Sequence, residues 1–385
     1  MSVRSETPGV PEIPAPLAGQ PPGETTPPAW PLRALRALAQ GLGYAAGLLA
    51  LMSLTFLALR INPITALMAL WEGAFGNASS GHLYPLSETL VKTSPLLLTG
   101  LGIVVAWRAG LFSIGAEGQL LMGALSAAAL ARFASSLPGP LLTLLMILAA
   151  MAAGALWGAI AGWLRVRRNV QEVISTIMLN YIALALVGWM VRGPLQERAR
   201  ISPQSEPVPD AALFARIIPP AWSGGIPTRL HSGVLLAFLA AIVVYLYLYY
   251  TAAGFGLRVV GQNPEAARAA RFPVPKLRMQ AMAISGALCG LAGGVELLGI
   301  AIRLYDNFSP GWGYTAIPVA LLGGLHPLGT VLSALFFGAL TAGSGNLERF
   351  SGVPSVVINI IQAAAVLAVV GVRAWRARRA GSAED

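Results

Sequence analysis

Several ionisable side chains of this sequence stand within apolar stretches, where a charge is costly to bury. Glu117 lies in the glycine-rich run 115–119, and Glu296 lies among further glycines. Glu88 and Lys92 are four residues apart, which would put them on one face of a helix. Inside a membrane such residues line a polar path or make packed polar contacts. The alternatives are a structural hydrogen bond to backbone for Glu117, a packed contact for Glu296, and an ion pair near the outer membrane surface for Glu88 and Lys92.

The composition explains why these stretches are read as membrane segments. Apolar residues make up 56% of the 385 residues and charged residues only 11%, whereas a soluble domain carries about 25% charged residues. Long apolar runs recur along the chain, which predicts an all-α polytopic membrane protein with about 8–10 transmembrane helices. The formal charge is +10. Because the basic residues cluster beside apolar runs, they indicate membrane orientation and contact with lipid rather than nucleic-acid binding.

The chain carries no pattern typical of an enzyme. Cys289 is the single cysteine, and the three histidines are far apart, so we expect no disulfide within the chain, no metal site and no catalytic residues. A phosphate-binding loop needs a glycine directly before its lysine. Neither Lys92 nor Lys276 has one. The sequence therefore predicts a transport subunit with no cofactor of its own, and any ATP would be used by a partner.

Apolar runs and basic clusters together predict the organisation of the chain. Residues 1–38 are rich in proline and are expected to form a disordered cytoplasmic tail, 39–373 a transmembrane domain and 374–385 a basic cytoplasmic tail. Both termini and the loop 252–280 are expected inside the cell, and the loop 192–232 outside. The predicted spans are 41–61, 86–106, 111–132, 140–164, 173–191, 233–251, 281–301 and 353–372.

Two places interrupt the apolar runs. The region 314–345 is broken at 323–329, and each half looks too short to cross, so it predicts two short spans or a re-entrant pair. A second break is expected at 111–119. Phe112-Ser-Ile-Gly115 is similar to Phe308-Ser-Pro-Gly311, as a trace of duplicated halves or by chance. Broken helices at membrane depth line a wet path or are packed in protein. We therefore expect 115–119 and 314–329 to face one another across a conduit.

Polar and aromatic residues in or near these breaks and spans are the candidates for the substrate path. A half-helix end offers free backbone N–H groups to a polar ligand, and an aromatic ring could stack on a base or sugar, or anchor the chain at the membrane interface. The candidate path residues are Ser113, Glu117, Gln119, Asn180, Glu296, Trp312 and Tyr314.

Two further patterns concern mechanics. Glycines recur every fourth residue at 154, 158 and 162 and again at 286, 290 and 294, which predicts close helix crossings. The segment 256–271 is charged and rich in alanine, and it lies between two apolar runs on the basic side. Residues 263–271 should form a short helix there, parallel to the membrane, which another protein could push. This indicates a transporter driven by an external motor.

Four motifs, in order, resemble a known family. They are Gly110-Leu-Phe-Ser-Ile-Gly-Ala-Glu-Gly-Gln-Leu120, Glu172-Val-Ile-Ser-Thr-Ile-Met-Leu-Asn-Tyr-Ile182, Gly261-Gln-Asn-Pro-Glu-Ala-Ala267 and Val319-Ala-Leu-Leu-Gly-Gly-Leu-His-Pro-Leu-Gly329. Together they are similar to permease subunits of ABC importers in the branched-chain amino acid, ribose and nucleoside group, and most of all to nucleoside-type permeases.

The resemblance implies partners and a function. The partners would be an ABC ATPase, a second homologous permease in a heterodimer, and an extracytoplasmic substrate-binding lipoprotein, all at a bacterial cell membrane. The function would be a path for nucleosides; the alternatives are a simple-sugar permease of the ribose type and a proton-coupled secondary transporter. By the same resemblance, the residues expected to dock on the ATPase are Asn263, Pro264, Glu265, Ala266, Ala267, Arg268 and Arg271.

Overall fold

The structure, a computed structural model, describes residues 60–76, 83–219 and 226–351, with parts of 47–58 and 357–371. All elements named below belong to the unit that begins at Leu48. The described part is helical and contains no strand. The α-helices are α2 (Pro63–Phe75), α3 (Tyr84–Arg108), α4 (Ala116–Phe133), α5 (Gly139–Arg168), α6 (Glu172–Arg192), α7 (Gly233–Tyr250), α8 (Ala252–Gln262), α9 (Pro264–Ala269), α10 (Val274–Glu296), α11 (Trp312–Leu322) and α12 (Pro327–Ser351).

Six of the described helices are long and apolar enough to cross a membrane, which confirms an all-α polytopic membrane fold. They are α3, α5, α6, α7, α12, and α10 together with the π-helical turn Leu297–Ala301 that continues it. The predicted spans at 41–61 and 353–372 lie largely outside the described residues, and the predicted tails at 1–38 and 374–385 lie entirely outside them.

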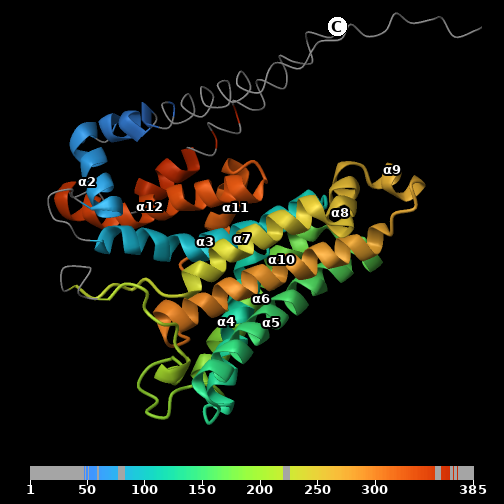
Figure 1. Ribbon diagram of the computed structural model, residues 1–385, viewed down its shortest axis with the longest axis horizontal. Coiled ribbons are helices and arrows are strands. Elements are labelled where there is room, and N and C mark those ends of the chain that lie inside the picture. The colour runs from blue at the N-terminus through green and yellow to red at the C-terminus, as the bar shows by residue number, and fades with distance from the viewer. Residues whose placement is uncertain are drawn as a thin grey trace, which may run out of the picture. The chain divides into compact units, whose positions relative to one another are not determined.

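The two ends of the helix bundle are distinct (Figure 1). One end carries α8 and α9, and we call it the α9 end. There Arg108, the last residue of α3, donates from Nε to the carbonyl oxygen of Leu325 at 2.8 Å. The other end carries residues 193–219 and 226–232, and we call it the loop end. There Arg229 pairs with Glu88 near the start of α3. Helix α3 therefore runs from the loop end to the α9 end.

Helix α3 is the core element of the bundle. Within its most apolar window 89% of the residues are buried, against 28% for α5 and 33% for α6. A helix that is apolar all round packs against neighbours on every side, and α3 contacts α7, α10, α11 and α12. Helix α10 is also largely buried, whereas α5, α6, α7 and α12 expose large apolar side chains, as membrane-exposed helices do.

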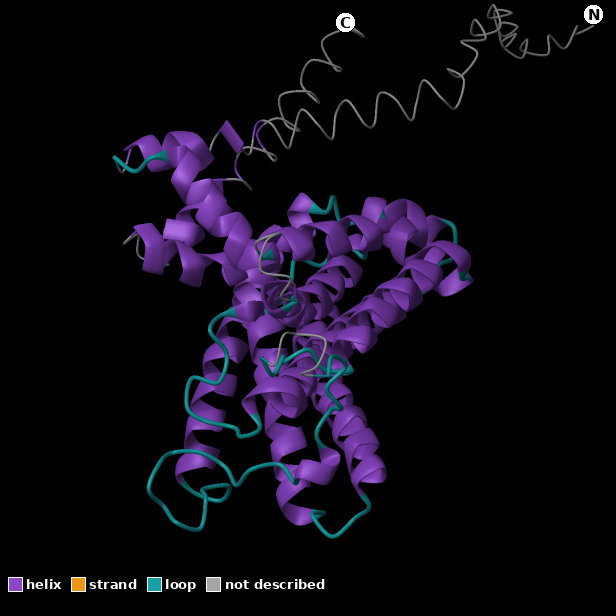
Figure 2. Ribbon diagram, turned by 60° about the vertical axis from the view of Figure 1, so that its left-hand side comes forward, coloured by secondary structure: helices purple, strands orange, loops and turns teal. Residues whose placement is uncertain are grey.

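The two glycine-rich helices α5 and α10 touch backbone to backbone. A Cβ added at Gly154 would lie 2.2 Å from the carbonyl oxygen of Gly286, and one at Gly290 would lie 2.2 Å from that of Ala150. The two helices lie side by side in the bundle (Figure 1), whose described part is formed by helices joined by loops (Figure 2). The close crossing predicted from the four-residue glycine spacing is confirmed.

The region 314–345 differs from its prediction in one half. Helix α11 has only 11 residues and α12 has 25, or about 16 Å and about 37 Å at 1.5 Å per residue. The prediction that both halves are too short to cross is therefore wrong for the second half. Pro327 begins α12, as proline often does in a first turn, and the helix continues beyond 345 to Ser351.

Helix α2 was not predicted within the segment 62–85. The Asn62 side chain caps it by accepting from the Ile64 N–H at 3.0 Å, and Pro63 occupies its first turn. Its buried face packs against α12, where a Cβ at Gly73 would lie 2.9 Å from the Gly343 Cα. The weakly apolar end of α12 is thus covered by a helix of the same chain.

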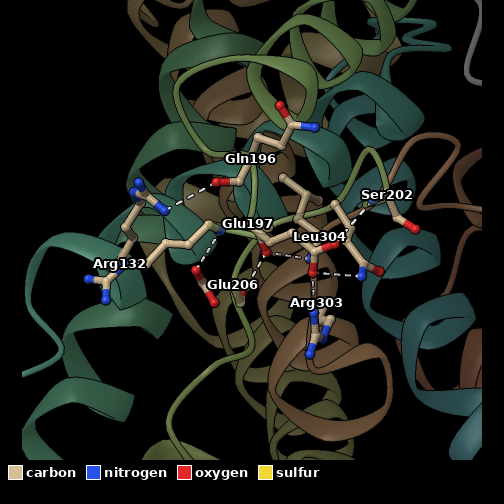
Figure 3. Close-up of polar contacts among 10 residues, drawn as sticks. Arg132, Gln196, Glu197, Ser202, Glu206, Arg303 and Leu304 are labelled. Carbon is tan, nitrogen blue, oxygen red and sulfur yellow. Dashed lines mark hydrogen bonds and ion pairs between the residues drawn. The ribbon is translucent and has the colours of Figure 1, made fainter. Parts of the chain in front are cut away.

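The loop end is a folded cap rather than a loose connection (Figure 3). Ser205 N–H donates to the Leu304 carbonyl at 2.7 Å, and Val208 N–H donates to the Ile302 carbonyl at 2.9 Å. Glu197 accepts from Arg303 at 2.7 Å and from the Gln204 amide at 2.9 Å. We call residues 193–219 and 226–232 the loop cap; it holds the chain that leaves α10.

Candidate functional site

The first interruption of helix lies between α3 and α4, at residues 109–115. Its backbone is satisfied by side chains on successive turns of α6. Phe112 N–H donates to Glu172 Oε1 at 3.3 Å, and Ile114 N–H donates to Thr176 Oγ1 at 3.2 Å. One turn further, Asn180 Oδ1 accepts from the Gly118 N–H at 2.9 Å. Non-helical backbone at membrane depth needs such partners, and α6 supplies them.

Asn180 contributes more than one hydrogen bond to this break. Its Nδ2 donates to the Ile114 carbonyl at 2.9 Å and to the Tyr314 hydroxyl at 3.3 Å. It therefore ties the first interruption both to α6 and to the start of α11. The sequence analysis singled out Asn180 but missed Glu172 and Thr176, although their spacing of four residues was a readable signal.

The second interruption lies between α10 and α11, at residues 302–311. The chain leaves the helix through a left-handed residue, Ile302 (φ 62°), and re-enters helix after Gly311 (φ 94°). Ser309 Oγ accepts from the N–H groups of Gly311 and Trp312, each at 3.2 Å. It thereby satisfies backbone donors that the start of α11 leaves open.

The starts of α4 and α11 meet in direct contact. Glu117 Oε2 accepts from the Gly313 N–H at 2.7 Å, and a Cβ at Gly313 would lie 2.2 Å from the Glu117 backbone nitrogen. These positions are 196 residues apart, the same offset that separates the two Phe-Ser-x-Gly segments. We call this contact the α4–α11 junction. The two predicted segments touch at this point, while residues 323–329 lie at the α9 end, and a conduit beside the junction stays a prediction.

The predicted path residues fall into three groups. Ser113, Glu117, Gln119 and Asn180 are buried at the junction, and three of them bond to backbone there. Trp312 is half-buried, and Tyr314 exposes 44% of its surface. Glu296 lies apart, at the loop end of α10, where Lys92 and Arg229 act on it electrostatically. Whether any of them touches substrate stays a prediction.

Comparison with known proteins decides the family. Residues 86–370 match the family described as "Branched-chain amino acid transport system / permease component". The chain belongs to this permease family. The permease is 36% identical to the glucose ABC transporter permease protein TsgB13 of Haloferax volcanii, over 88% of each chain. No solved structure matches it significantly.

Two relatives of the permease have nucleoside names. It is 37% identical to the guanosine ABC transporter permease protein NupP of Bacillus subtilis, over 85% of this chain and 90% of that one. It is 31% identical to the nucleoside ABC transporter permease protein NupB of Lactococcus lactis, over 82% of this chain and 85% of that one.

Polar hollows of the permease open beside the junction. One of about 310 Å³ is lined by α3, the start of α11, α12 and residues 357–364, and includes Lys92, Trp312 and Gln362. A second of about 520 Å³ lies towards Glu88 and Arg229. The two hollows share Lys92, Thr341 and Ser344, so they are neighbours. The sequence analysis considered Lys92 together with Glu88 and selected Trp312, but it did not select Thr341 or Ser344, which both hollows share.

The expected ion pair between Glu88 and Lys92 does not form in the permease. Glu88 instead pairs with Arg229 of the loop cap, through Nε to Oε1 at 2.9 Å and through a second contact from Nη2 to Oε2. A planar guanidinium matches a carboxylate in this two-point geometry better than an ammonium does. Lys92 is left to line the hollows.

At the α9 end, the predicted short helix is present as α9, Pro264–Ala269. Asn263 Oδ1 accepts from the N–H groups of Glu265 and Ala266, each at 3.0 Å. Ala267 is buried, whereas Arg268 and Arg271 are exposed. The helix is therefore anchored on one side and presents a charged surface on the other.

Among the described residues, no group of His, Cys, Asp and Glu side chains could hold a metal ion.

Proposed function

We propose that this permease is the membrane-spanning subunit of an ABC importer and forms the translocation path for nucleosides, in the cell membrane of a bacterium. The observation that carries the proposal is the α4–α11 junction with a polar hollow beside it. Two helices start at this depth from non-helical backbone, and Trp312, the neighbour of Gly313 in the chain, lines the hollow. Backbone broken in this way lines substrate sites in other transporters.

The chemistry of the hollow suits an uncharged, hydroxyl-rich ligand with a flat ring. Its lining includes the Trp312 indole, the hydroxyls of Thr315 and Thr341, and the amides of Asn359 and Gln362. Small-molecule sites combine apolar walls with a few placed polar groups, in cavities of about 300–1,000 Å³. The relatives named for guanosine and nucleosides support the same substrate class.

The proposed partners follow from the two ends of the bundle. A separate ABC ATPase would dock on α9, where Arg268 and Arg271 are exposed, and a substrate-binding lipoprotein would deliver nucleoside to the loop end. Both termini would then be cytoplasmic. Bacillus subtilis has a second guanosine permease, NupQ, which is 31% identical over 70% of this chain. Two relatives from one organism support a heterodimer with a second homologous permease.

The test is uptake by the complete transporter in proteoliposomes. The permease is reconstituted with its ATPase, second permease and binding protein, and [3H]guanosine uptake is followed with ATP inside the vesicles. We expect uptake that depends on ATP and survives a protonophore, and that Arg268→Glu abolishes without reducing the amount of inserted protein. Uptake that collapses with the proton gradient and ignores ATP would instead establish a secondary transporter.

A simple-sugar permease is the second candidate, and the similarity to the Haloferax volcanii glucose permease favours it. Uptake by the same proteoliposomes distinguishes a nucleoside permease from a simple-sugar permease. Nucleoside transport predicts that excess unlabelled inosine suppresses guanosine uptake and that labelled glucose and ribose do not accumulate. Accumulation of either sugar, with no guanosine uptake, would assign the sugar function.

A further inference from the structure

The hollow beside the junction contains a positive charge, Lys92, that forms no ion pair with any of the described residues. Lys92 projects from α3, about two turns from the loop end of that helix. The nearest acid on its own helix face, Glu88, is taken by Arg229. No carboxylate of the described residues lies within ion-pair distance of Lys92, although Glu296 acts with it electrostatically. A lysine ammonium has three donors and no acceptor, and it has to find its acceptors in the hollow.

The rest of the lining completes a recognition site around that charge. Trp312 borders the hollow, and its indole Nε1 is buried without a partner among the described residues. Within the described part of the chain, the Gln362 side chain makes one long contact, from Nε2 to Thr341 Oγ1 at 3.4 Å, and Asn359 is exposed. A ring stacked on the indole could therefore reach an ammonium, an amide and a hydroxyl along its edge.

The positive charge discriminates between purine bases. A 6-oxopurine presents two neighbouring acceptors, O6 and N7, and lysine is a common partner of that edge. Adenine carries an amino donor in place of O6, and this donor cannot pair with an ammonium. The oxo edge therefore offers the Lys92 ammonium two acceptors, whereas the adenine edge offers N7 alone and places a donor beside it.

We propose that Lys92 is a specificity-determining residue that selects 6-oxopurine nucleosides, such as guanosine and inosine, over adenosine as they pass the hollow beside Trp312. This inference rests on the proposed nucleoside function. It adds a base preference that is set within the membrane, beyond the preference of the binding protein that captures the substrate.

The experiment compares guanosine and adenosine uptake by the complete transporter before and after Lys92→Met. The binding protein is the same in both preparations, so its own preference cancels when the two uptake ratios are divided. We expect the guanosine-to-adenosine ratio to fall about tenfold in Lys92→Met, the effect of losing one such base contact. Lys92→Arg keeps the charge and its donors and should retain most of the preference.

The matched control is Lys276→Met, which removes the exposed lysine near the start of α10 and should leave the ratio unchanged. An unchanged ratio in Lys92→Met, or equal loss of both substrates with normal membrane insertion, overturns the role of Lys92 while guanosine uptake still supports the proposed function. Loss of GMP uptake with guanosine unaffected would overturn it too, since the charge would then serve an anion. Absence of any nucleoside uptake by the unmodified transporter contradicts the proposed function itself.

Discussion

The two helix interruptions share a sequence pattern but are held in different ways. The first, at 109–115, is anchored by side chains of one membrane helix, through Glu172, Thr176 and Asn180 of α6. The second, at 302–311, is anchored by backbone of the loop cap, through Ser205 and Val208. Each interruption is followed by a helix, α4 or α11, that begins at the α4–α11 junction. One is fixed from within the bundle, and the other from the loop end.

This difference indicates which side of the proposed substrate path is rigid and which side can move when another protein contacts the loop cap. The α6 side chains restrict the first interruption to one conformation, because its backbone groups would otherwise lack hydrogen-bond partners in the absence of water. The second interruption follows the loop cap, which also carries Arg229 and so contacts Glu88 of α3. Binding of another protein to the loop cap would therefore displace the start of α11 more directly than the start of α4.

The largest expected effect comes from filling the junction itself. Gly313→Ala places a Cβ 2.2 Å from the Glu117 backbone nitrogen, so the two helix starts cannot meet, and we expect nucleoside uptake to be lost. Gly115→Ala should be milder, because its Cβ would meet the Thr176 side chain at 3.0 Å rather than backbone. Gly345→Ala, with open space around the Cβ, is the control. Equal losses at 313 and 115 would remove the distinction between the two interruptions.

The anchors of the two interruptions should differ in their contribution to stability. Asn180→Ala leaves the Gly118 N–H and the Ile114 carbonyl without their partner, at a cost of about 2–4 kcal/mol. Ser205→Ala removes the hydroxyl that accepts from Leu304 N–H but keeps the backbone pairing, and should cost about 1 kcal/mol. Thermal unfolding of the solubilised permease, followed by tryptophan fluorescence, measures both.

The control for this pair is Ser175→Ala, which removes only a hydrogen bond within α6, to the Glu172 carbonyl. It should lower the melting temperature less than either anchor variant. If Ser205→Ala proved as damaging as Asn180→Ala, the loop cap would hold its interruption as firmly as the membrane helix does.

A further expected effect is a pH dependence that arises in the loop cap. His231 is buried, stacks on Phe214 with ring centroids 5.7 Å apart, and neither of its nitrogens has a partner among the described residues. Burial, followed by the Arg216 charge, lowers its pKa from 6.5 to about 4. The unfolded chain therefore takes up a proton before the folded one does. The resulting stability is complete above pH 6.5 and is lost as the pH falls towards 4.

Melting temperatures at pH 7 and pH 5 test this dependence. We expect a loss of up to about 2 kcal/mol over that interval, and His231→Asn should flatten it. Glu197 does not interfere: its hydrogen bond from Gln204, with help from Ser202 and Arg303, lowers its pKa from 4.5, so its contribution is lost only at still lower pH. An equal fall with pH in the His231→Asn variant would assign the effect to other groups.

Local features of the fold could be predicted from the sequence. The apolar runs predicted five of the six long helices of the described residues, all except α12, and the glycine spacing predicted the contact of α5 with α10. The charged, alanine-rich composition of 256–271 predicted the short helix that the structure has as α9. Each of these patterns lies within a short, continuous segment of the sequence. The length of α12 was misjudged because its last turns are polar, and they stay helical because α2 packs beside them.

The site depended on contacts that no short window contains. Glu117 and Gly313 are 196 residues apart, and nothing near Glu117 shows that its carboxylate meets a helix start rather than a conduit. Lys92 was assigned to the wrong neighbour for a similar reason. Its helical spacing favoured Glu88, but Arg229 is 141 residues from Glu88 and offers the better geometry.

The backbone contact between α5 and α10 has a mechanical consequence. Where glycines bring two helices within touching distance, there is no layer of side chains to slip or compress, and the pair behaves as one rod. That rod runs the length of the bundle, and α10 begins five residues after α9 ends. A displacement of α9 would therefore move α5 and α10 together as one rigid body. The bending that lets a substrate pass would then occur in the less tightly packed helices around them.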